Sequence, residues 1–312
     1  MKYKNKMLSS SQPVVSNDYP YSREQITEHS GSIRLTDSDS ENNLDMFCYS
    51  KCAYSDDDIV KRTRGVVFNG DNVVFSGFNY VEDINVNDKE RLSKLESTLS
   101  SQKFKVFNSY EGTLIRVFYF GDKWYITTHR KLDAFKSKWA GKNSFGECFK
   151  NSINEHGNYE MFFDGLDKRF GYMFLLVNNN DNRIVCIPGE TSILHVGTFD
   201  ENKQLRFDVD VGVERPKEIE FESFQSMTDY VEGISIENYQ GIIIFDGNLQ
   251  YKILNSNYVD LFSIRGNEPS IKFRYLQVRN NVKHVNDIYY LYPRYADKFD
   301  EYEDILSRLA RS

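Results

Sequence analysis

Pairs of short apolar segments joined by tight turns recur along the chain and limit what it can fold into. Asn69-Gly70-Asp71, Gly121-Asp122 and Asp246-Gly247 each lie between two such segments, and turns of this composition predict β-hairpins. The segments 171–187 and 195–211 have the same character. Because hairpins pair antiparallel strands, and because single helices rather than βαβ units separate them, we expect an α+β fold with antiparallel sheets.

Helical periodicity is present between the hairpins, at 88–101, 144–157 and 223–234. The start of the chain is instead polar and rich in Ser, Asn and Asp, which is typical of a flexible segment. The sequence contains no GxGxxG or GxxxxGK[ST] element, so we do not expect a dinucleotide-binding or P-loop fold. We expect three parts: a flexible polar arm (1–43), a central domain (44–255) and a helical C-terminal extension (256–312).

The charge and the reactive residue types exclude further classes of protein. The formal net charge is −7, whereas a protein that coats nucleic-acid duplexes is strongly basic. The 4 cysteines and 5 histidines do not show the spacing of a zinc site, so we expect reduced thiols and no bound metal. No apolar run approaches the roughly 18 residues of a membrane span and no signal-peptide pattern is present, so we expect a soluble, cytoplasmic protein.

Five short motifs follow one another in a fixed order through the central part of the chain. They are TRGVVF (63–68), SYEGTL (109–114), NRIV (182–185), QGIIIF (240–245) and YKI (251–253). In this order they resemble the motifs of bacteriophage-type RNA ligases, which belong to the covalent nucleotidyltransferase superfamily with DNA ligases and mRNA capping enzymes. The stretch EGTLIR…KWYITTHRKLDAF is also similar to ligase-like proteins of large DNA viruses. The resemblance implies an antiparallel-sheet, ATP-grasp-like nucleotidyltransferase domain with a small helical C-terminal region.

The motifs depart from the family at positions that carry its chemistry. The resemblance implies a lysine nucleophile at the start of the second motif, where this chain has Ser109. Ser109 has no neighbouring base in the sequence, so we do not expect it to attack a phosphate. At three other positions this chain also differs from what the resemblance implies. It has Leu175 or Leu176 where the family has an acidic residue, Gln240 where the family has a glutamate, and Leu254 where the family has a lysine; a second family lysine is present as Lys252. Because metal-assisted phosphoryl transfer needs these carboxylates and cations, we expect no catalytic residue and no required cofactor.

The residues that remain near these motifs suit binding. We expect phosphate contacts from cations, stacking from aromatic rings, an acidic partner for a cationic methylated guanine, and two polar groups on the last hairpin. The candidate cations are Arg64, Arg116, His129, Arg130 and Lys131, and the candidate stacking residues are Tyr110, Trp124 and Trp139. The candidate acidic partner is Glu111, and the two polar groups on the last hairpin are Gln240 and Lys252. Each class has a structural alternative, because a basic stretch also suits a solvated surface, tryptophans suit a core, and a carboxylate suits a turn.

Three functions fit these residues. The first, which we favour, is a non-catalytic RNA-binding protein that holds an RNA 5′ end or cap, with a nucleotide or cap as its ligand. The second is an active ATP-dependent RNA ligase or guanylyltransferase that uses a relocated lysine. The third is a structural subunit whose pocket is filled by side chains. We expect RNA as the partner, protein partners at the N-terminal arm or the C-terminal helix, no membrane, and the host cytoplasm as the location of a viral protein.

Overall fold

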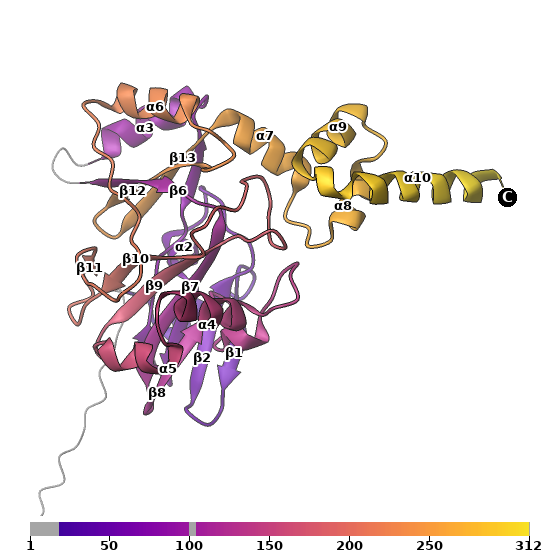
Figure 1. Cartoon of the computed structure of the whole chain (residues 1–312). Helices are drawn as coiled ribbons and strands as arrows, with labels where there is room; N and C mark the ends of the chain where they lie inside the picture. Colours follow the sequence, from indigo (N-terminus) through magenta and orange to yellow (C-terminus); the bar gives the residue numbers. More distant parts are fainter. Residues whose placement is uncertain (1–18, 100–103, 312) are drawn as a thin grey trace, which may run out of the picture.

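The computed structural model describes residues 19–99 and 104–311, and three β-sheets organise them (Figure 1). Sheet A has the strand order β1 (Ile33–Asp39), β2 (Leu44–Tyr49), β3 (Arg64–Asn69) and β4 (Asn72–Phe75). Sheet B has the order β5 (Glu82–Asn85), β13 (Leu249–Leu254), β12 (Gly241–Asp246) and β6 (Lys105–Ser109). Sheet C has the order β11 (Leu205–Arg206), β10 (Ile193–Phe199), β9 (Gly171–Val177), β7 (Gly112–Phe120) and β8 (Lys123–Thr127).

Among the described strands, every named pair is antiparallel except β5 with β13. The predicted α+β fold with antiparallel sheets is therefore confirmed. The three expected glycine turns close the hairpins β3–β4, β7–β8 and β12–β13. Gly121 and Asp122 have φ values of 56° and 63°, the left-handed conformation that a two-residue hairpin turn requires. These turns set the register of strands that line the cavity described below.

Three helices occupy the segments that the periodicity predicts, α3 (Lys89–Thr98), α4 (Phe145–His156) and α6 (Phe224–Gly233). Ser144 caps α4 by accepting a hydrogen bond from the backbone N–H of Glu147 at 3.2 Å, and the Glu147 carboxylate accepts one from the N–H of Ser144 at 2.6 Å. The apolar face of α4 packs on sheet C, and α3 and α6 pack on the outer face of sheet B (Figure 1). The shorter helices are α1 (Arg23–Glu28), α2 (Asp58–Arg62), α5 (Tyr159–Phe162), η1 (Ala134–Lys136), η2 (Phe163–Gly165) and η3 (Pro293–Tyr295).

Part of the expected N-terminal arm is ordered. Residues 1–18 lie outside the described residues, but from residue 19 to 43 the chain forms α1 and most of the β1–β2 hairpin. Ile26 and Ile33 are buried in the core of sheet A, and the hydroxyl groups of Tyr19 and Thr63 are hydrogen-bonded at 2.6 Å. For residues 19–43 the prediction of a flexible arm is wrong, because a few apolar side chains in a polar segment suffice to dock it.

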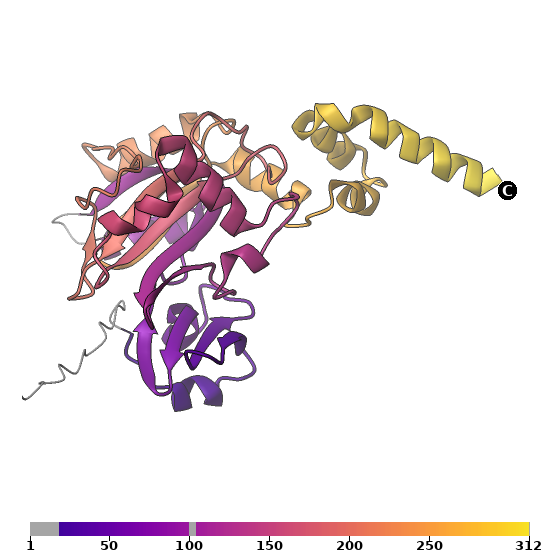
Figure 2. The same ribbon diagram turned by 60° about the horizontal axis from the view of Figure 1, so that its bottom comes forward.

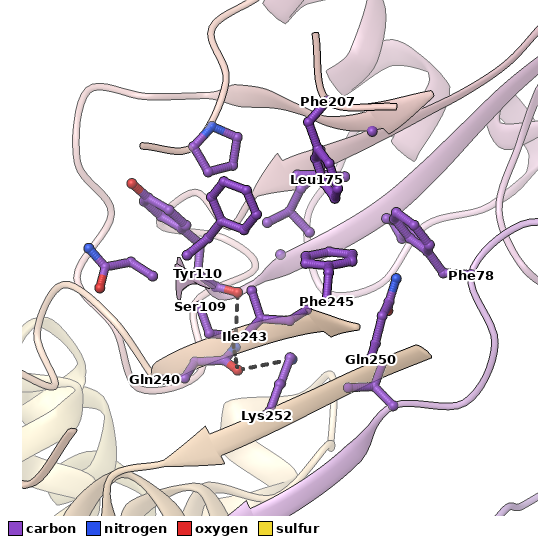
Figure 3. A pocket seen from close by; sticks show the side chains of 18 of the residues that line it. Phe78, Ser109, Tyr110, Leu175, Phe207, Gln240, Ile243, Phe245, Gln250 and Lys252 are labelled. Carbon is purple, nitrogen blue, oxygen red and sulfur yellow. Dashed lines mark hydrogen bonds between the residues drawn. The ribbon is translucent and has the colours of Figure 1, made fainter. Parts of the chain in front are cut away.

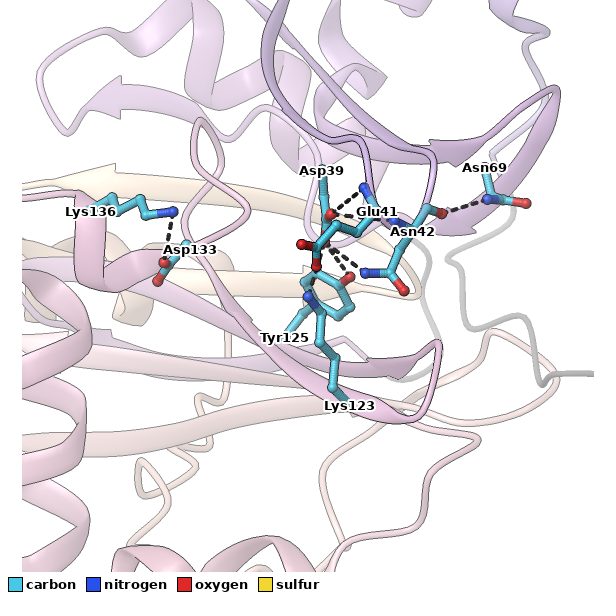
Figure 4. Close-up of polar contacts among 8 residues, drawn as sticks. All are labelled: Asp39, Glu41, Asn42, Asn69, Lys123, Tyr125, Asp133 and Lys136. Atoms are coloured by element: carbon cyan, nitrogen blue, oxygen red, sulfur yellow. Dashed lines mark hydrogen bonds and ion pairs between the residues drawn. The ribbon is translucent and has the colours of Figure 1, made fainter.

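The β1–β2 hairpin is tied to sheet C through one carboxylate (Figure 4). Asp39 accepts hydrogen bonds from Tyr125 Oη at 2.7 Å, Lys123 Nζ at 3.0 Å and Asn42 Nδ2 at 3.0 Å. Burial by itself raises the pKa of Asp39, but the donors from Tyr125, Lys123 and Asn42 outweigh it and hold the pKa well below its usual value. The contact fixes sheet A, which forms a separate lobe in Figure 2, against the β7–β8 hairpin.

The C-terminal extension is helical, as predicted. It consists of α7 (Ser256–Arg265), α8 (Ile271–Val278), α9 (Val282–Leu291) and α10 (Ala296–Arg311), and it projects from the sheets in Figure 1 and Figure 2. It has its own core, in which the rings of Tyr275 and Phe299 stack with centroids 4.4 Å apart. Val185 and Cys186 join this core from the loop that follows β9, so the extension is anchored to the sheet region there. Among the described residues, no helix is both long and apolar enough to cross a membrane.

Candidate functional site

A cavity of about 590 Å³ opens between sheets B and C (Figure 3). Strands β6, β12 and β13 supply its floor, and β7, β9 and β10 supply the opposite wall. Side chains on alternate strand positions point into it, so that Phe107 and Ser109 of β6 both line it, as do Gln250 and Lys252 of β13. Strands of sheets B and C thus place polar and aromatic groups around one space.

The floor of the cavity carries a hydrogen-bond network built from motif residues. The Ser109 hydroxyl donates to Gln240 Oε1 at 3.3 Å, and Lys252 Nζ donates to the same oxygen at 3.2 Å (Figure 3). The Gln240 amide nitrogen donates to the carbonyl oxygen of Tyr110 at 3.1 Å. Gly241 follows with φ of 152°, and a Cβ there would lie 2.0 Å from the carbonyl oxygen of Ile253, so this position requires glycine.

Lys252 is the basic group nearest to this network. Burial lowers its pKa, while the carboxylate of Asp83, on the neighbouring strand β5, opposes that shift. Arg64, from the start of β3, is a second cation that lines the cavity, and its Nη1 donates to the carbonyl oxygen of Asn79 at 3.1 Å. Arg215 lines the cavity as well, so three cationic side chains surround it.

Aromatic rings form the wall beside the floor. The centroid of the Phe245 ring lies 5.6 Å from that of Phe78, 5.7 Å from Phe107 and 5.1 Å from Phe207. Ile243 and Leu175 extend this surface (Figure 3). Such a wall suits a flat, apolar face, such as that of a nucleobase.

Three side chains that line the cavity have a buried polar atom without a hydrogen-bond partner in the protein. These atoms are Arg64 Nε, Gln250 Nε2 and His195 Nδ1. Burial lowers the pKa of His195 to about 4, so the ring is neutral at pH 7, and because Nε2 donates to the carbonyl oxygen of Gly197 at 3.0 Å, Nδ1 is an acceptor. In Figure 3 the Gln250 amide points toward the rings of Phe78 and Phe245. The cavity thus offers two donors and one acceptor, and buried polar groups of this kind need partners.

Metal ligands are scarce around the cavity. Its lining carboxylates are Asp83 and Glu218, and Glu218 pairs with Lys105 at 2.5 Å. Within residues 19–99 and 104–311, no three His, Cys, Asp or Glu side chains gather in a way that would hold a metal ion. Of the two leucines considered for the family's acidic position, Leu175 lines the cavity and Leu176 does not.

The chain is similar in sequence to viral proteins and in structure to an RNA ligase. It is 30% identical over 260 residues to the "Immediate-early protein ICP-46 homolog" of Invertebrate iridescent virus 6, covering 76% of this chain and 57% of that protein. The homolog of Invertebrate iridescent virus 3 is 30% identical over 221 residues, covering 69% of this chain and 49% of that protein. An archaeal ATP-dependent RNA ligase matches with a TM-score of 0.50 and 12% identity, over 93% of this chain and 74% of the ligase. No protein-family model matches.

This chain has a ligase-type nucleotidyltransferase fold. The resemblance that the five motifs predict is confirmed, and the relatives support a viral origin. The chain spans about half the length of the curated relatives it matches.

The ligase fold brings four of the eleven predicted site residues to the cavity, namely Arg64, Tyr110, Gln240 and Lys252. Tyr110 packs edge-on against Tyr239, with centroids 5.0 Å apart. Ser109, at the position of the family's lysine, lines the same cavity. The other seven predicted residues do not line it, and the contacts of each explain why.

Glu111 is a buried anchor rather than a surface or ligand-binding carboxylate. Its side chain is 2% exposed and accepts hydrogen bonds from the backbone N–H groups of Ile184, Val185 and Cys186 at 3.3, 2.8 and 3.1 Å and from Tyr258 Oη at 2.9 Å. Burial raises the pKa of Glu111, while these donors oppose the shift. The predicted strand at 182–185 is wrong for the same reason, because its N–H groups bind this carboxylate instead of a neighbouring strand.

Arg116 is also structural in the ligase fold. It is 1% exposed, and its guanidinium donates to the carbonyl oxygens of Arg64, Gly65 and Thr128 at 3.0, 2.6 and 2.6 Å. Gly65 has φ of 72°, and a Cβ there would lie 2.5 Å from Arg116 Nη2. The glycine at position 65 of the motif TRGVVF therefore leaves the space in which the Arg116 guanidinium reaches three carbonyl oxygens.

The basic residues after β8 are engaged within the protein. Burial and the nearby Arg64, Arg116 and Arg130 lower the pKa of His129 to about 3, so it is neutral at pH 7. Arg130 donates to the carbonyl oxygens of Tyr49 and Ser50 at 3.3 and 2.9 Å, and Lys131 pairs with Asp37 at 3.6 Å. Arg130 and Lys131 thus have partners within the protein, and none of residues 129–131 lines the cavity.

Neither tryptophan faces the cavity. Trp124 packs on the outer face of sheet C, with its ring centroid 5.8 Å from that of Phe163. Trp139 lies under the Arg265 guanidinium, 5.4 Å from its ring centroid, toward the C-terminal helices. Neither tryptophan therefore lines the cavity, whose aromatic side chains are Phe78, Phe107, Phe207 and Phe245 together with Tyr49, Tyr80 and Tyr110.

Sequence reasoning missed Phe107, Phe245, Gln250, Asp83 and His195. Strand alternation could have found three of them, because Phe107 precedes Ser109 by two positions, Gln250 precedes Lys252 by two, and Phe245 follows Ile243 by two. Asp83 and His195 reach the cavity from β5 and β10, and no local pattern marks those strands as its neighbours.

Proposed function

We propose that this chain binds a nucleotide-like group, such as an RNA 5′ end or cap, in the cavity between sheets B and C without forming a covalent bond to it. One observation carries the proposal. The position of the family's nucleophilic lysine is Ser109, with its hydroxyl hydrogen-bonded to Gln240, while the same cavity is lined by aromatic rings and by two donors and one acceptor that lack partners in the protein.

The lining of the cavity supports binding. A planar base would lie against the Phe245 side of the wall, where the Gln250 amide and His195 Nδ1 offer a donor and an acceptor to its edge. Arg64 and Lys252 offer positive charge to a phosphate. The volume of about 590 Å³ falls within the usual range for small-molecule sites, roughly 300–1,000 Å³, which argues against a pocket filled by side chains.

The lining also supports the absence of group transfer. A covalent step would need an unprotonated amine and metal-bound phosphates. Gln240 and Leu175 supply no carboxylate, and Ser109 supplies no amine. We therefore propose that no metal or other cofactor is required, and that the ligand is the nucleotide or cap itself.

Ligand-induced stabilisation tests the proposal. A ligand that binds only the native state stabilises it by about 2.7 kcal/mol at 100 times its Kd, which raises Tm by several degrees. We expect this rise with GTP, ATP or a cap analogue, without added metal. Gln250→Leu removes a buried donor that has no protein partner, so we expect it to abolish the rise without lowering the stability of the free protein.

Gln225→Leu is the matched control, because Gln225 is exposed on α6 and away from the cavity. It should keep the ligand-induced rise. A radiolabelled, acid-labile adduct after incubation with α-labelled ATP or GTP and Mg²⁺ would contradict the non-covalent proposal. No ligand-induced rise with any of the three compounds would contradict nucleotide binding itself.

One observation favours the active-enzyme alternative. Burial lowers the pKa of Lys252, which increases the fraction of unprotonated amine at a given pH. If Lys252 were a relocated nucleophile, the adduct would form in the unchanged protein and disappear in Lys252→Arg. The relatives are viral, and the RNA partner we propose is accordingly one found in the cytoplasm of an infected cell.

A further inference from the structure

A second cavity, of about 240 Å³, lies between the C-terminal helices and the loop after β9, and its lining is strongly cationic. Its charged residues are Arg183, Arg265, Lys272, Arg294 and Lys298, with Asp181 as a single carboxylate. The whole chain has a net charge of −7, whereas this surface is positively charged. We call these five residues the C-terminal cationic cluster.

The two inner arginines of the cluster are held by neutral acceptors. Arg183 donates to the carbonyl oxygens of Cys186, Leu291 and Val185 at 3.1, 2.5 and 3.1 Å. Arg265, which is 2% exposed, donates to Tyr292 Oη at 2.6 Å and to the carbonyl oxygens of Gly266 and Glu268. Carbonyl and hydroxyl oxygens satisfy the N–H groups but do not neutralise the charge, so one buried guanidinium, Arg265, and one half-buried guanidinium, Arg183, keep their positive charge here.

The three outer cations are exposed and lie beside tyrosine rings. Lys272 Nζ lies 4.5 Å from the ring centroid of Tyr302, and the Arg294 guanidinium and Lys298 Nζ lie 5.1 and 5.3 Å from that of Tyr295. Among the described residues, no carboxylate forms an ion pair with any member of the C-terminal cationic cluster. The surface therefore presents positive charge and half-buried aromatic rings together.

The cluster is fixed relative to the cavity between sheets B and C. Tyr292 Oη donates to the carbonyl oxygens of Arg183 and Ile184 at 2.6 and 2.9 Å. The N–H groups of this loop bind Glu111, two residues after Ser109 in the chain. A chain of buried hydrogen bonds thus connects the floor of the cavity to the helices that carry the cluster.

We infer that the C-terminal cationic cluster is a second contact site for single-stranded RNA, engaging backbone phosphates beyond the end that the cavity holds. The inference rests on the proposed function for the origin of the RNA. Cations interleaved with aromatic rings suit a single strand, whose phosphates pair with Lys and Arg and whose bases lie against the rings. An acidic protein segment would use the charges but not the rings.

The test is binding of a fluorescently labelled, capped single-stranded RNA of about 16 nucleotides, the upper range for one binding module, to the full-length protein. The variant Lys272→Ala/Arg294→Ala/Lys298→Ala removes the outer cations. We expect its affinity to fall on the order of 10- to 100-fold, and the slope of log K against log salt to flatten by about 2, since each lost contact to a single strand contributes roughly 0.7.

The matched control is Lys283→Ala/Arg308→Ala/Arg311→Ala, which removes the same charge from exposed positions on α9 and α10 outside the cavity. It should change affinity less than twofold. Lys298→Glu changes one exposed residue and should also lower the affinity for RNA. It replaces the triple variant in the test if the triple variant does not fold.

Equal losses in the cluster and control variants would overturn the inference, because they would show a non-specific charge effect. Binding of an acidic peptide, but not of RNA, that depends on the cluster would also overturn it and identify a protein partner. The Tm rise with a cap analogue separates the two proposals. If the rise is intact in the cluster variant and its RNA affinity is unchanged, only the inference fails. If no compound raises the Tm of the unchanged protein while RNA binding still depends on the cluster, only nucleotide binding in the cavity fails.

Discussion

The buried carboxylate of Glu111 gives the sharpest prediction about how this molecule is held together. The resemblance in sequence places it in the motif that begins with Ser109, where a role toward the ligand was expected. The structure instead gives it four donors, three from the loop 184–186 and one from Tyr258 on α7. Replacing it should therefore affect folding and the docking of the C-terminal helices rather than ligand contacts.

The magnitude follows from the number of donors that Glu111→Ala would leave without an acceptor. A hydrogen bond to a charged group contributes about 1.5–3 kcal/mol, and each stranded buried donor costs roughly 1–3 kcal/mol. Because water would enter and satisfy part of the site, we expect a loss of about 3–5 kcal/mol in the free energy of unfolding. Glu111→Gln keeps one amide oxygen as an acceptor in place of the two carboxylate oxygens. Its free energy of unfolding should fall by about half as much as that of Glu111→Ala.

Urea unfolding followed by circular dichroism measures these losses, with Glu232→Ala as the control. Glu232 is an exposed carboxylate 3.6 Å from Lys89, and its loss should cost less than about 0.5 kcal/mol. A parallel readout is proteolysis at the loop 184–186, which should become faster in Glu111→Ala. A loss below about 1 kcal/mol in Glu111→Ala, or an unchanged cleavage rate, would refute the view that this carboxylate anchors the loop.

Three further predictions concern Arg116, Asp39 and Ser109. Arg116→Leu should lower the free energy of unfolding by about 3 kcal/mol or more, measured by urea unfolding, because the carbonyl oxygens of Gly65 and Thr128 lose their donor. Asp39 has a lowered folded-state pKa against an ordinary value of 3.8, so its stabilising effect is present above about pH 4 and is lost as pH falls; Asp39→Asn should be less stable at pH 7 by roughly 1–2 kcal/mol, and this difference should shrink on acid titration. Ser109→Lys alone should form no labelled nucleotide adduct, because Gln240 and Leu175 still lack carboxylates, whereas a clear adduct would show that the lysine is the single missing group.

Local patterns in the sequence were sufficient for the hairpins that close at glycine turns, but not for the pair expected within 171–187, where β9 pairs with β10 instead. Gly121-Asp122 and Asp246-Gly247 adopt the turns that their composition predicts, and Ser144 with Glu147 caps the helix that follows. The order of the motifs also agrees with the position of Ser109 beside Gln240 and Lys252. Their strands β6, β12 and β13 are neighbours in sheet B. Each of these features depends on contacts between residues or motifs that the sequence places in a known order.

The remaining site residues depend on contacts that no local pattern encodes. Glu111 and Arg116 are close in sequence to residues that line the cavity. The Glu111 side chain nevertheless binds the loop 184–186, and the Arg116 side chain binds carbonyl oxygens around Gly65. Charged side chains were taken for ligand contacts, although a buried backbone group that lacks a partner attracts them equally well. His195 reaches the cavity only because β10 pairs with β9, which is a property of the sheet rather than of the strand.

The two polar substitutions on the floor of the cavity have a single physical explanation. In the family the resemblance implies a lysine at 109 and a glutamate at 240, which place one positive and one negative charge at these two positions, beside the lysine that this chain keeps as Lys252. Removing either alone would leave a buried charge without its partner, a cost of several kcal/mol. Ser109 and Gln240 remove both, and the glutamine oxygen then accepts from the serine hydroxyl and from Lys252 while its nitrogen satisfies the carbonyl oxygen of Tyr110. Ser109 and Gln240 are therefore neutral and hydrogen-bonded to each other, and Lys252 is the cation beside them, an arrangement suited to holding a ligand and unsuited to attacking one through residue 109.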